Sequence, residues 1–168
     1  LFVSHGSPML PLEPGTAGPM LQALGRDLPR PEIILAFSPH WMAREPTVGP
    51  SARPETVHDF GGFDRALYAL QYPAPGAPQW APRVERLLRQ AGWQVHEDPH
   101  RGLDHGIWSP LRLMYPEADV PVVPLAMPWP LDVAGAYRLG AALAPLTVQG
   151  ALLLGTGSLT HNLREFDP

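Results

Sequence analysis

Short runs of apolar, strand-forming residues alternate along the chain with longer segments in which apolar residues recur at helical spacing. Most of the runs are apolar throughout, as is typical of parallel strands covered on both faces. The pattern predicts strands at 1–3, 33–37, 47–51, 93–97, 120–127 and 151–155, and helices at 16–28, 63–70, 78–91 and 132–146. This alternation predicts an α/β fold with a central mixed, mainly parallel sheet flanked by helices. A single domain over residues 1–168 fits the chain length.

Three of the predicted strands end close to a histidine. His5 follows the first run, His40 follows the second, and His161 follows the last across a segment of small residues. Ligands of open α/β sheets bind at the carboxyl ends of the strands, so we expect these three side chains to converge at one rim. We also expect the first two strands to be neighbours in the sheet. Imidazole suits iron, zinc, copper and nickel, and it serves as a general base near neutral pH. The sequence therefore predicts a metal site at one end of the strands.

Two further histidines lie beside a carboxylate. His105 falls in a segment, 100–110, that its glycines and proline predict to be a loop, with a helical turn only from residue 111. Asp104 could orient the His105 ring, and Asp59 could do the same for His58. The alternative interpretation of both pairs is a plain loop turn.

Other polar and aromatic residues sit next to the candidate histidines. Trp41 and Trp108 could form the wall of a pocket for an aromatic substrate, or could pack in the core. Ser7 lies in the turn after His5, but no Gly-x-Ser-x-Gly elbow surrounds it, which argues against a hydrolase nucleophile.

Composition narrows the functional classes. A net charge of −4 without a basic cluster argues against a nucleic-acid partner. The chain has no cysteine, so any metal must use histidine, carboxylate or backbone oxygen. No apolar run approaches the roughly 20 residues that span a bilayer, and no signal peptide is visible. We therefore expect no membrane partner and a cytoplasmic location.

Six short motifs surround the candidate histidines and form a specific set when taken together. They are residues 4–8 (SHGSP), 38–41 (SPHW), 53–60 (RPETVHDF), 102–106 (GLDHG), 111–116 (LRLMYP) and 157–163 (GSLTHNL). With these motifs the chain resembles the class III extradiol ring-cleavage dioxygenases, in the branch similar to DOPA-extradiol dioxygenase. The resemblance covers nearly the whole chain.

The resemblance implies an enzyme that opens the ring of a catechol with O₂, using non-haem Fe(II), with Zn(II) possible in its place. It implies metal ligation by His5 and His40, an acid/base role or a place in a zinc shell for His161, and a position facing substrate and oxygen for His105. It also implies that a further His or Glu ligand belongs to a C-terminal part of the family domain that residues 1–168 lack. We expect substrate contacts from three residues near these histidines: Ser7, Trp41 and His58.

Two other functional classes stay open at this point. A zinc hydrolase would use the same histidines to activate water. A non-catalytic metal-binding or interaction domain is the third reading. The expected partners are a small aromatic diol and O₂, and apolar strands near the chain ends could also pair with a second copy in a homo-oligomer.

Overall fold

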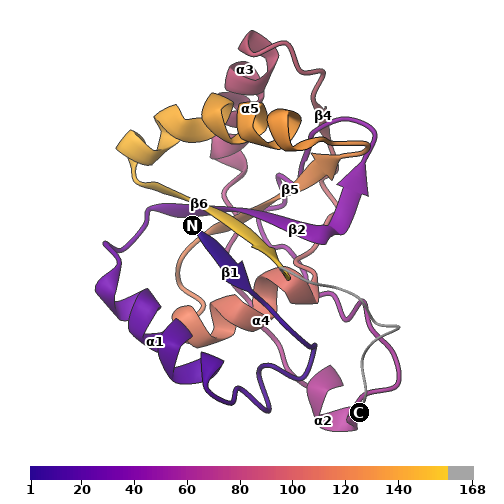
Figure 1. Cartoon of the computed structure of the whole chain (residues 1–168), viewed down its shortest axis with the longest axis vertical. Helices are drawn as coiled ribbons and strands as arrows, with labels where there is room; N and C mark the ends of the chain where they lie inside the picture. The colour runs from indigo at the N-terminus through magenta and orange to yellow at the C-terminus, as the bar shows by residue number, and fades with distance from the viewer. Residues whose placement is uncertain (159–168) are drawn as a thin grey trace.

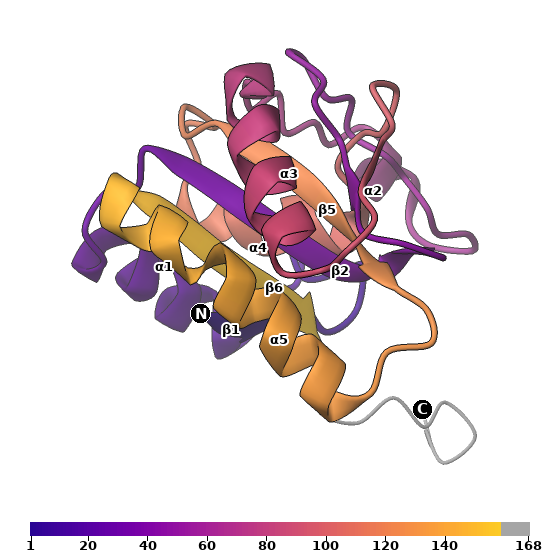
Figure 2. The same ribbon diagram turned by 90° about the horizontal axis from the view of Figure 1, so that it is seen from above.

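A computed structural model describes residues 1–158 of the chain. The predicted site residue His161 lies outside the described residues. A central six-stranded sheet carries helices on both faces, which gives three layers (Figure 1). The same layering is seen from above in Figure 2, where α5 and α3 lie on the near side of the sheet and α1 on the far side.

The strands and helices follow one another in the order that the apolar pattern predicts, with some shifts at their ends. The strands are β1 (Phe2–Ser4), β2 (Ile33–Ala43), β3 (Thr47–Val48), β4 (His96–Glu97), β5 (Val122–Pro128) and β6 (Ala151–Gly157). The α-helices are α1 (Ala17–Asp27), α2 (Arg65–Tyr68), α3 (Ala81–Gln90), α4 (His105–Met114) and α5 (Val133–Leu143). Two 3₁₀ turns, η1 (Pro78–Trp80) and η2 (Ala144–Gln149), precede α3 and follow α5. None of the helices in residues 1–158 combines the length and the apolar character that crossing a membrane requires.

The sheet is mixed and mainly parallel, as predicted, with strand order β1-β6-β2-β5-β3-β4. Among the strand pairs of residues 1–158, the pairing of β3 with β5 alone is antiparallel. The prediction that the first two strands are neighbours was wrong, because β6 lies between β1 and β2 and pairs in parallel with both. The carboxyl ends of these three strands still share one edge of the sheet, so the change of order leaves His5 and His40 at the same edge.

Strand β2 is the centre of the core, and its residues alternate between two apolar clusters. Ile34 and Ala36 face α1 and α4, whereas Ile33 and Leu35 face α3 and α5, and all four are fully buried. Burial on both faces explains why this run is apolar at every position. The strand does not end at Phe37 as predicted, since it shifts register after that residue and continues to Ala43.

Helix α4 is the largest departure from the predicted elements. It begins at His105, whereas Gly106 and Pro110 had indicated a loop up to that proline. The buried positions Ile107, Trp108 and Leu111 recur at helical spacing, and their packing between α1 and the sheet outweighs the two helix-breaking residues. His105 is therefore the first residue of a helix and not part of a flexible connection.

Two helix-interior glycines predict opposite effects of the same substitution. In Gly25→Ala the new Cβ would collide with the backbone oxygen of Met114, where α1 crosses α4, so we expect a loss of about 3 kcal/mol in the free energy of unfolding. In Gly140→Ala the new Cβ would meet no atom within 4 Å among the described residues, so higher helix propensity should add about 0.5–1 kcal/mol. Urea unfolding of both variants measures the difference, and equal effects at the two sites would contradict the α1–α4 contact.

Candidate metal centre

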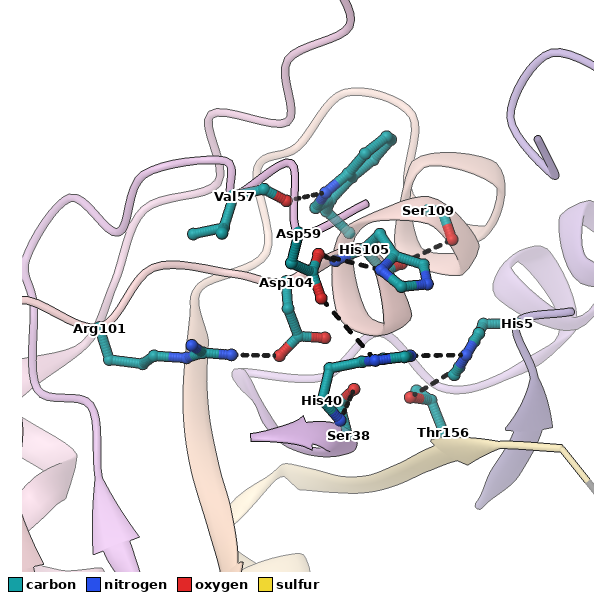
Figure 3. A network of polar contacts seen from close by, with 11 residues as sticks. His5, Ser38, His40, Val57, Asp59, Arg101, Asp104, His105, Ser109 and Thr156 are labelled. Carbon is teal, nitrogen blue, oxygen red and sulfur yellow. Dashed lines mark hydrogen bonds and ion pairs between the residues drawn. The ribbon is translucent and has the colours of Figure 1, made fainter. Parts of the chain in front are cut away.

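Two histidines meet at the carboxyl edge of the sheet. His5 directly follows β1, and its backbone N–H donates to the carbonyl of Gly157 at the end of β6, over 3.1 Å. His40 lies on β2, on the other side of β6, and the Nε2 atoms of His5 and His40 are 3.1 Å apart (Figure 3). The Nδ1 atom of His5 lies 3.3 Å from the Thr156 hydroxyl oxygen. The parallel pairing of three strands thus brings together two imidazoles that are 35 residues apart in the sequence.

A third imidazole comes from the first residue of α4. The centroid of the His105 ring lies 4.1 Å from that of His40 and 5.3 Å from that of His5. One ligand nitrogen from each of the three rings falls within 4.8 Å of the others. His5 and His105 are almost fully buried, while the His40 side chain is 28% exposed. We call these three residues the histidine triad.

The contact between α4 and β2 is so close that only glycine fits at position 106. A Cβ there would collide with the Ser38 hydroxyl oxygen and would lie 2.9 Å from Cδ2 of His40. The Ser38 oxygen also accepts the backbone N–H of His40 at 3.2 Å. Gly106 therefore sets how deeply the start of the helix sits beside the His40 ring.

Asp59 lies between two rings of the triad. Its Oδ1 accepts both the backbone N–H and the ring Nδ1 of His105, each at 2.9 Å, and its Oδ2 is 3.8 Å from Nδ1 of His40. Partial burial would raise the pKa of Asp59, but the side-chain and backbone hydrogen bonds from His105, with the attraction of its ring, outweigh burial and lower the pKa to about 2. Asp59 is therefore a carboxylate at neutral pH.

Asp104 does not orient the neighbouring His105 ring, contrary to one interpretation of the sequence. Its Oδ2 accepts from Nη2 of Arg101 at 2.7 Å, and the carboxylate is fully buried. The Arg101 guanidinium also stacks on Trp41, 4.9 Å from the ring centroid. Trp41 thus covers an arginine that neutralises a buried carboxylate behind the triad.

The other predicted pairing, of His58 with Asp59, is also wrong. Nε2 of His58 lies 3.0 Å from the Leu70 carbonyl oxygen, and its ring packs against Phe60, Tyr68 and Trp108 with centroids 5.7–6.1 Å apart. Phe60 in turn makes an edge contact with His105, at 5.6 Å between centroids. A cluster of rings that includes His58 and Phe60 therefore lies beside the triad.

Two other predicted residues can be placed, one in the core and one in the turn after β1. Trp108 is fully buried and donates its indole N–H to the Val57 carbonyl oxygen at 2.9 Å, which favours the core-packing interpretation. The Ser7 hydroxyl accepts the Met9 backbone N–H at 3.2 Å in the turn after β1. The predicted role of His161 concerns a residue outside the described part of the chain.

The donor set of the triad fits a metal ion of the first transition row. Two nitrogens bound to one ion at about 2.0–2.1 Å lie roughly 3 Å apart, close to the observed 3.1 Å between the Nε2 atoms of His5 and His40. Uncharged imidazole ligands suit iron, zinc and copper more than calcium or magnesium. An ion held by some of these nitrogens keeps coordination positions open for other molecules.

The sequence analysis missed Asp59 as the partner of His105. The two residues are 46 positions apart, and each stands next to a residue of the other's type, which favoured local pairings in the sequence. In the structure, the parallel bridge between Thr56 and Leu103 aligns the two segments just before Asp59 and His105. Such a bridge follows from the folded topology and leaves no mark in the local pattern.

Comparisons with known proteins identify relatives of the chain. Two curated proteins named "4,5-DOPA dioxygenase extradiol" are similar to the chain: one from Beta vulgaris is 43% identical over 164 residues, which cover 95% of this chain and 61% of the relative. The other, from Escherichia coli K12, is 42% identical over 164 residues, covering 98% of this chain and 60% of the relative. The chain thus spans about three-fifths of the length of these curated relatives.

A solved structure shares the fold, and a family description matches the chain. The crystal structure of the uncharacterized protein JW3007 from Escherichia coli K12 superposes with a TM-score of 0.73 at 37% identity, covering 89% of this chain and 56% of that chain. Residues 1–168 match the family described as "Catalytic LigB subunit of aromatic ring-opening dioxygenase". The chain therefore belongs to the LigB family of class III extradiol dioxygenases.

Proposed function

We propose that the protein is a non-haem metal-dependent dioxygenase that opens the ring of a catechol with O₂, cutting beside the two hydroxyl groups. The observation that carries the proposal is the convergence of His5, His40 and His105 in a chain of this family. Relatives named as 4,5-DOPA dioxygenases support an aromatic diol as the substrate class. Because the chain spans only part of those relatives, the activity of the whole protein is part of this proposal.

His5 and His40 are the proposed metal ligands within the described residues. Their Nε2 atoms are close enough to bind one ion, and His161 is the proposed third member of the shell or an acid/base beside it. Fe(II) is the expected ion, and Zn(II) is the alternative. When bound, the iron supplies a Lewis acid for the catechol oxygens and a redox partner for O₂.

His105 is the proposed proton and oxygen handler. Its ring Nδ1 faces the Asp59 carboxylate, so its Nε2 is the nitrogen available to substrate and oxygen. A neutral Nε2 can accept the proton of a catechol hydroxyl and later return it, or donate a hydrogen bond once protonated. Burial of the ring shields this exchange from bulk water.

Ser7, Trp41 and His58 are the proposed substrate contacts. A cytoplasmic location and formation of a homo-oligomer are further predictions. In the described residues Trp41 already stacks on Arg101, and His58 already contacts the Leu70 carbonyl. These contacts do not occupy the exposed side of either residue, since both side chains are only half-buried.

Oxygen uptake tests the proposal directly. Protein loaded anaerobically with Fe(II) should consume one O₂ per catechol and form a yellow ring-opened product, with DOPA and protocatechuate as the first substrates. Protein loaded with Zn(II) should consume none. The intact mass of each preparation should be recorded, so that each measured oxygen uptake is assigned to a chain of known length.

A His40→Ala variant tests the ligand assignment, because it removes the more exposed of the two proposed ligands. We expect it to lose both iron retention and oxygen uptake while keeping its circular dichroism spectrum. Full iron occupancy in this variant would contradict the ligand assignment. Metal-dependent ester or amide hydrolysis without oxygen uptake would favour the zinc hydrolase.

A Gly106→Ala substitution should weaken metal binding without touching a ligand. The added Cβ would displace the Ser38 hydroxyl and the His40 ring, so we expect zinc affinity to fall by about 10- to 100-fold. Competition titration with a chromophoric chelator measures the affinity, and Gly140→Ala, whose Cβ would lie in open space, is the control. Unchanged affinity in Gly106→Ala would show that the start of α4 does not position His40.

A further inference from the structure

We propose that Asp59 is a positioning residue that fixes which nitrogen of His105 carries the proton, and that the same carboxylate biases His40 in the same sense. As a result, both rings turn Nε2 toward the space between the three imidazoles. This inference deepens the proposed function, since it concerns the readiness of the same site. It can nevertheless be tested on the metal-free protein.

The first argument is that one carboxylate oxygen binds two donors of a single residue. Oδ1 of Asp59 accepts the backbone N–H of His105 and its ring Nδ1, both at 2.9 Å. A carboxylate is an acceptor only, so Nδ1 must carry the hydrogen, and in the neutral ring Nε2 is then the basic nitrogen. Two bonds to one residue fix the ring rotation as well as the tautomer. Figure 3 shows the ring held in this way, with its second nitrogen turned away from Asp59.

The second argument is that His105 occupies the first turn of α4, where backbone N–H groups lack partners within the helix. Asp104, the residue before the helix, makes no side-chain capping bond, because its carboxylate pairs with Arg101. Asp59 supplies a carboxylate to this helix end from another segment of the chain. The positive end of the helix dipole favours the charged form of the carboxylate there. Capping the helix and orienting the ring are thus done by the same oxygen.

The third argument is that the segment carrying Asp59 is tied to the start of α4 at several points. The Val57 backbone N–H donates to the Leu103 carbonyl, and the Leu103 N–H donates to the Glu55 carbonyl, both at 2.8 Å. The indole N–H of Trp108 donates to the Val57 carbonyl. The carboxylate and the imidazole therefore belong to one hydrogen-bonded unit, so the ring orientation does not depend on a free loop.

The effect on His40 is electrostatic. Its Nδ1 lies 3.8 Å from Oδ2 of Asp59, beyond hydrogen-bond distance but near enough for the charge to favour a proton on that nitrogen. The His40 ring also packs against the His105 ring, with 4.1 Å between centroids. A rotation of either ring would therefore displace the other, and one carboxylate influences two of the three imidazoles.

The test is nitrogen-15 NMR of the histidine rings in metal-free protein near neutral pH, where long-range couplings report which ring nitrogen is protonated. An unconstrained histidine carries its proton mainly on Nε2. We expect His105 to be protonated on Nδ1 in the wild type and to shift toward Nε2 protonation in Asp59→Ala. Asp59→Asn should keep the wild-type pattern, because its amide oxygen can accept the same two bonds.

The matched control is Asp64→Ala, which also removes a carboxylate that caps a helix. Oδ1 of Asp64 accepts the Ala66 N–H at 2.8 Å at the start of α2. This variant should leave the His105 tautomer unchanged. Circular dichroism shows whether each variant is folded, and the wild-type spectrum tests the inference without any variant.

Two results would overturn the inference: Nε2 protonation of His105 in the wild type, or an unchanged tautomer in folded Asp59→Ala. In the Fe(II)-loaded enzyme we expect Asp59→Ala to lose about 10- to 100-fold in kcat, with Asp59→Asn much closer to the wild type. If the tautomer changes as expected but the wild type shows no oxygen uptake, the proposed function fails and the positioning role of Asp59 stands. The reverse pattern would leave the dioxygenase in place and remove Asp59 from its positioning role.

Discussion

The close packing of the start of α4 against β2 is the contact on which the site depends. At Gly106 the helix backbone lies so near the sheet that the Ser38 hydroxyl and the His40 ring fill the space a side chain would need. This contact places His105 beside His40 and within reach of His5. A helix held even one side chain further from the sheet would leave two strand-end histidines without the third. The burial of Ile107, Trp108 and Leu111 on the same helix supplies the apolar packing that keeps it there.

The sequence was a sufficient guide to those parts of the fold that local pattern determines. Strand β2 is apolar at four successive positions because both faces are covered, and α5 begins where its capping residue Asp132 accepts from the Gly135 N–H. The convergence of His5 and His40 also followed from the sequence, because the carboxyl ends of parallel strands share an edge. It did not require the correct strand order. The insertion of β6 between β1 and β2 pairs segments about 150 and about 120 residues apart, which no local pattern encodes.

The environment of His105 was beyond local reasoning for two physical reasons. Gly106 and Pro110 are helix-breaking by propensity, and only tertiary packing makes a helix of this segment. Its carboxylate partner is Asp59 and not the adjacent Asp104, because the parallel bridge at Thr56 and Leu103 aligns two distant segments. Adjacent residues at the start of a helix point in different directions, so sequence neighbours were poor candidates for a ring and its anchor.

The two carboxylates near the triad have different electrostatic consequences. The charge of Asp104 is balanced by the Arg101 guanidinium at 2.7 Å, and Trp41 covers that pair on its outer side. In the described residues Asp59 accepts from the backbone N–H and the ring of His105 and lies near the His40 ring, so its negative charge remains directed at the triad. Three imidazoles with one carboxylate beside them favour a divalent cation over an anion, since the ion gains both the nitrogen lone pairs and the attraction of the carboxylate. Arg101 thus permits a second carboxylate to be buried at the start of α4 while only one contributes to the charge of the site.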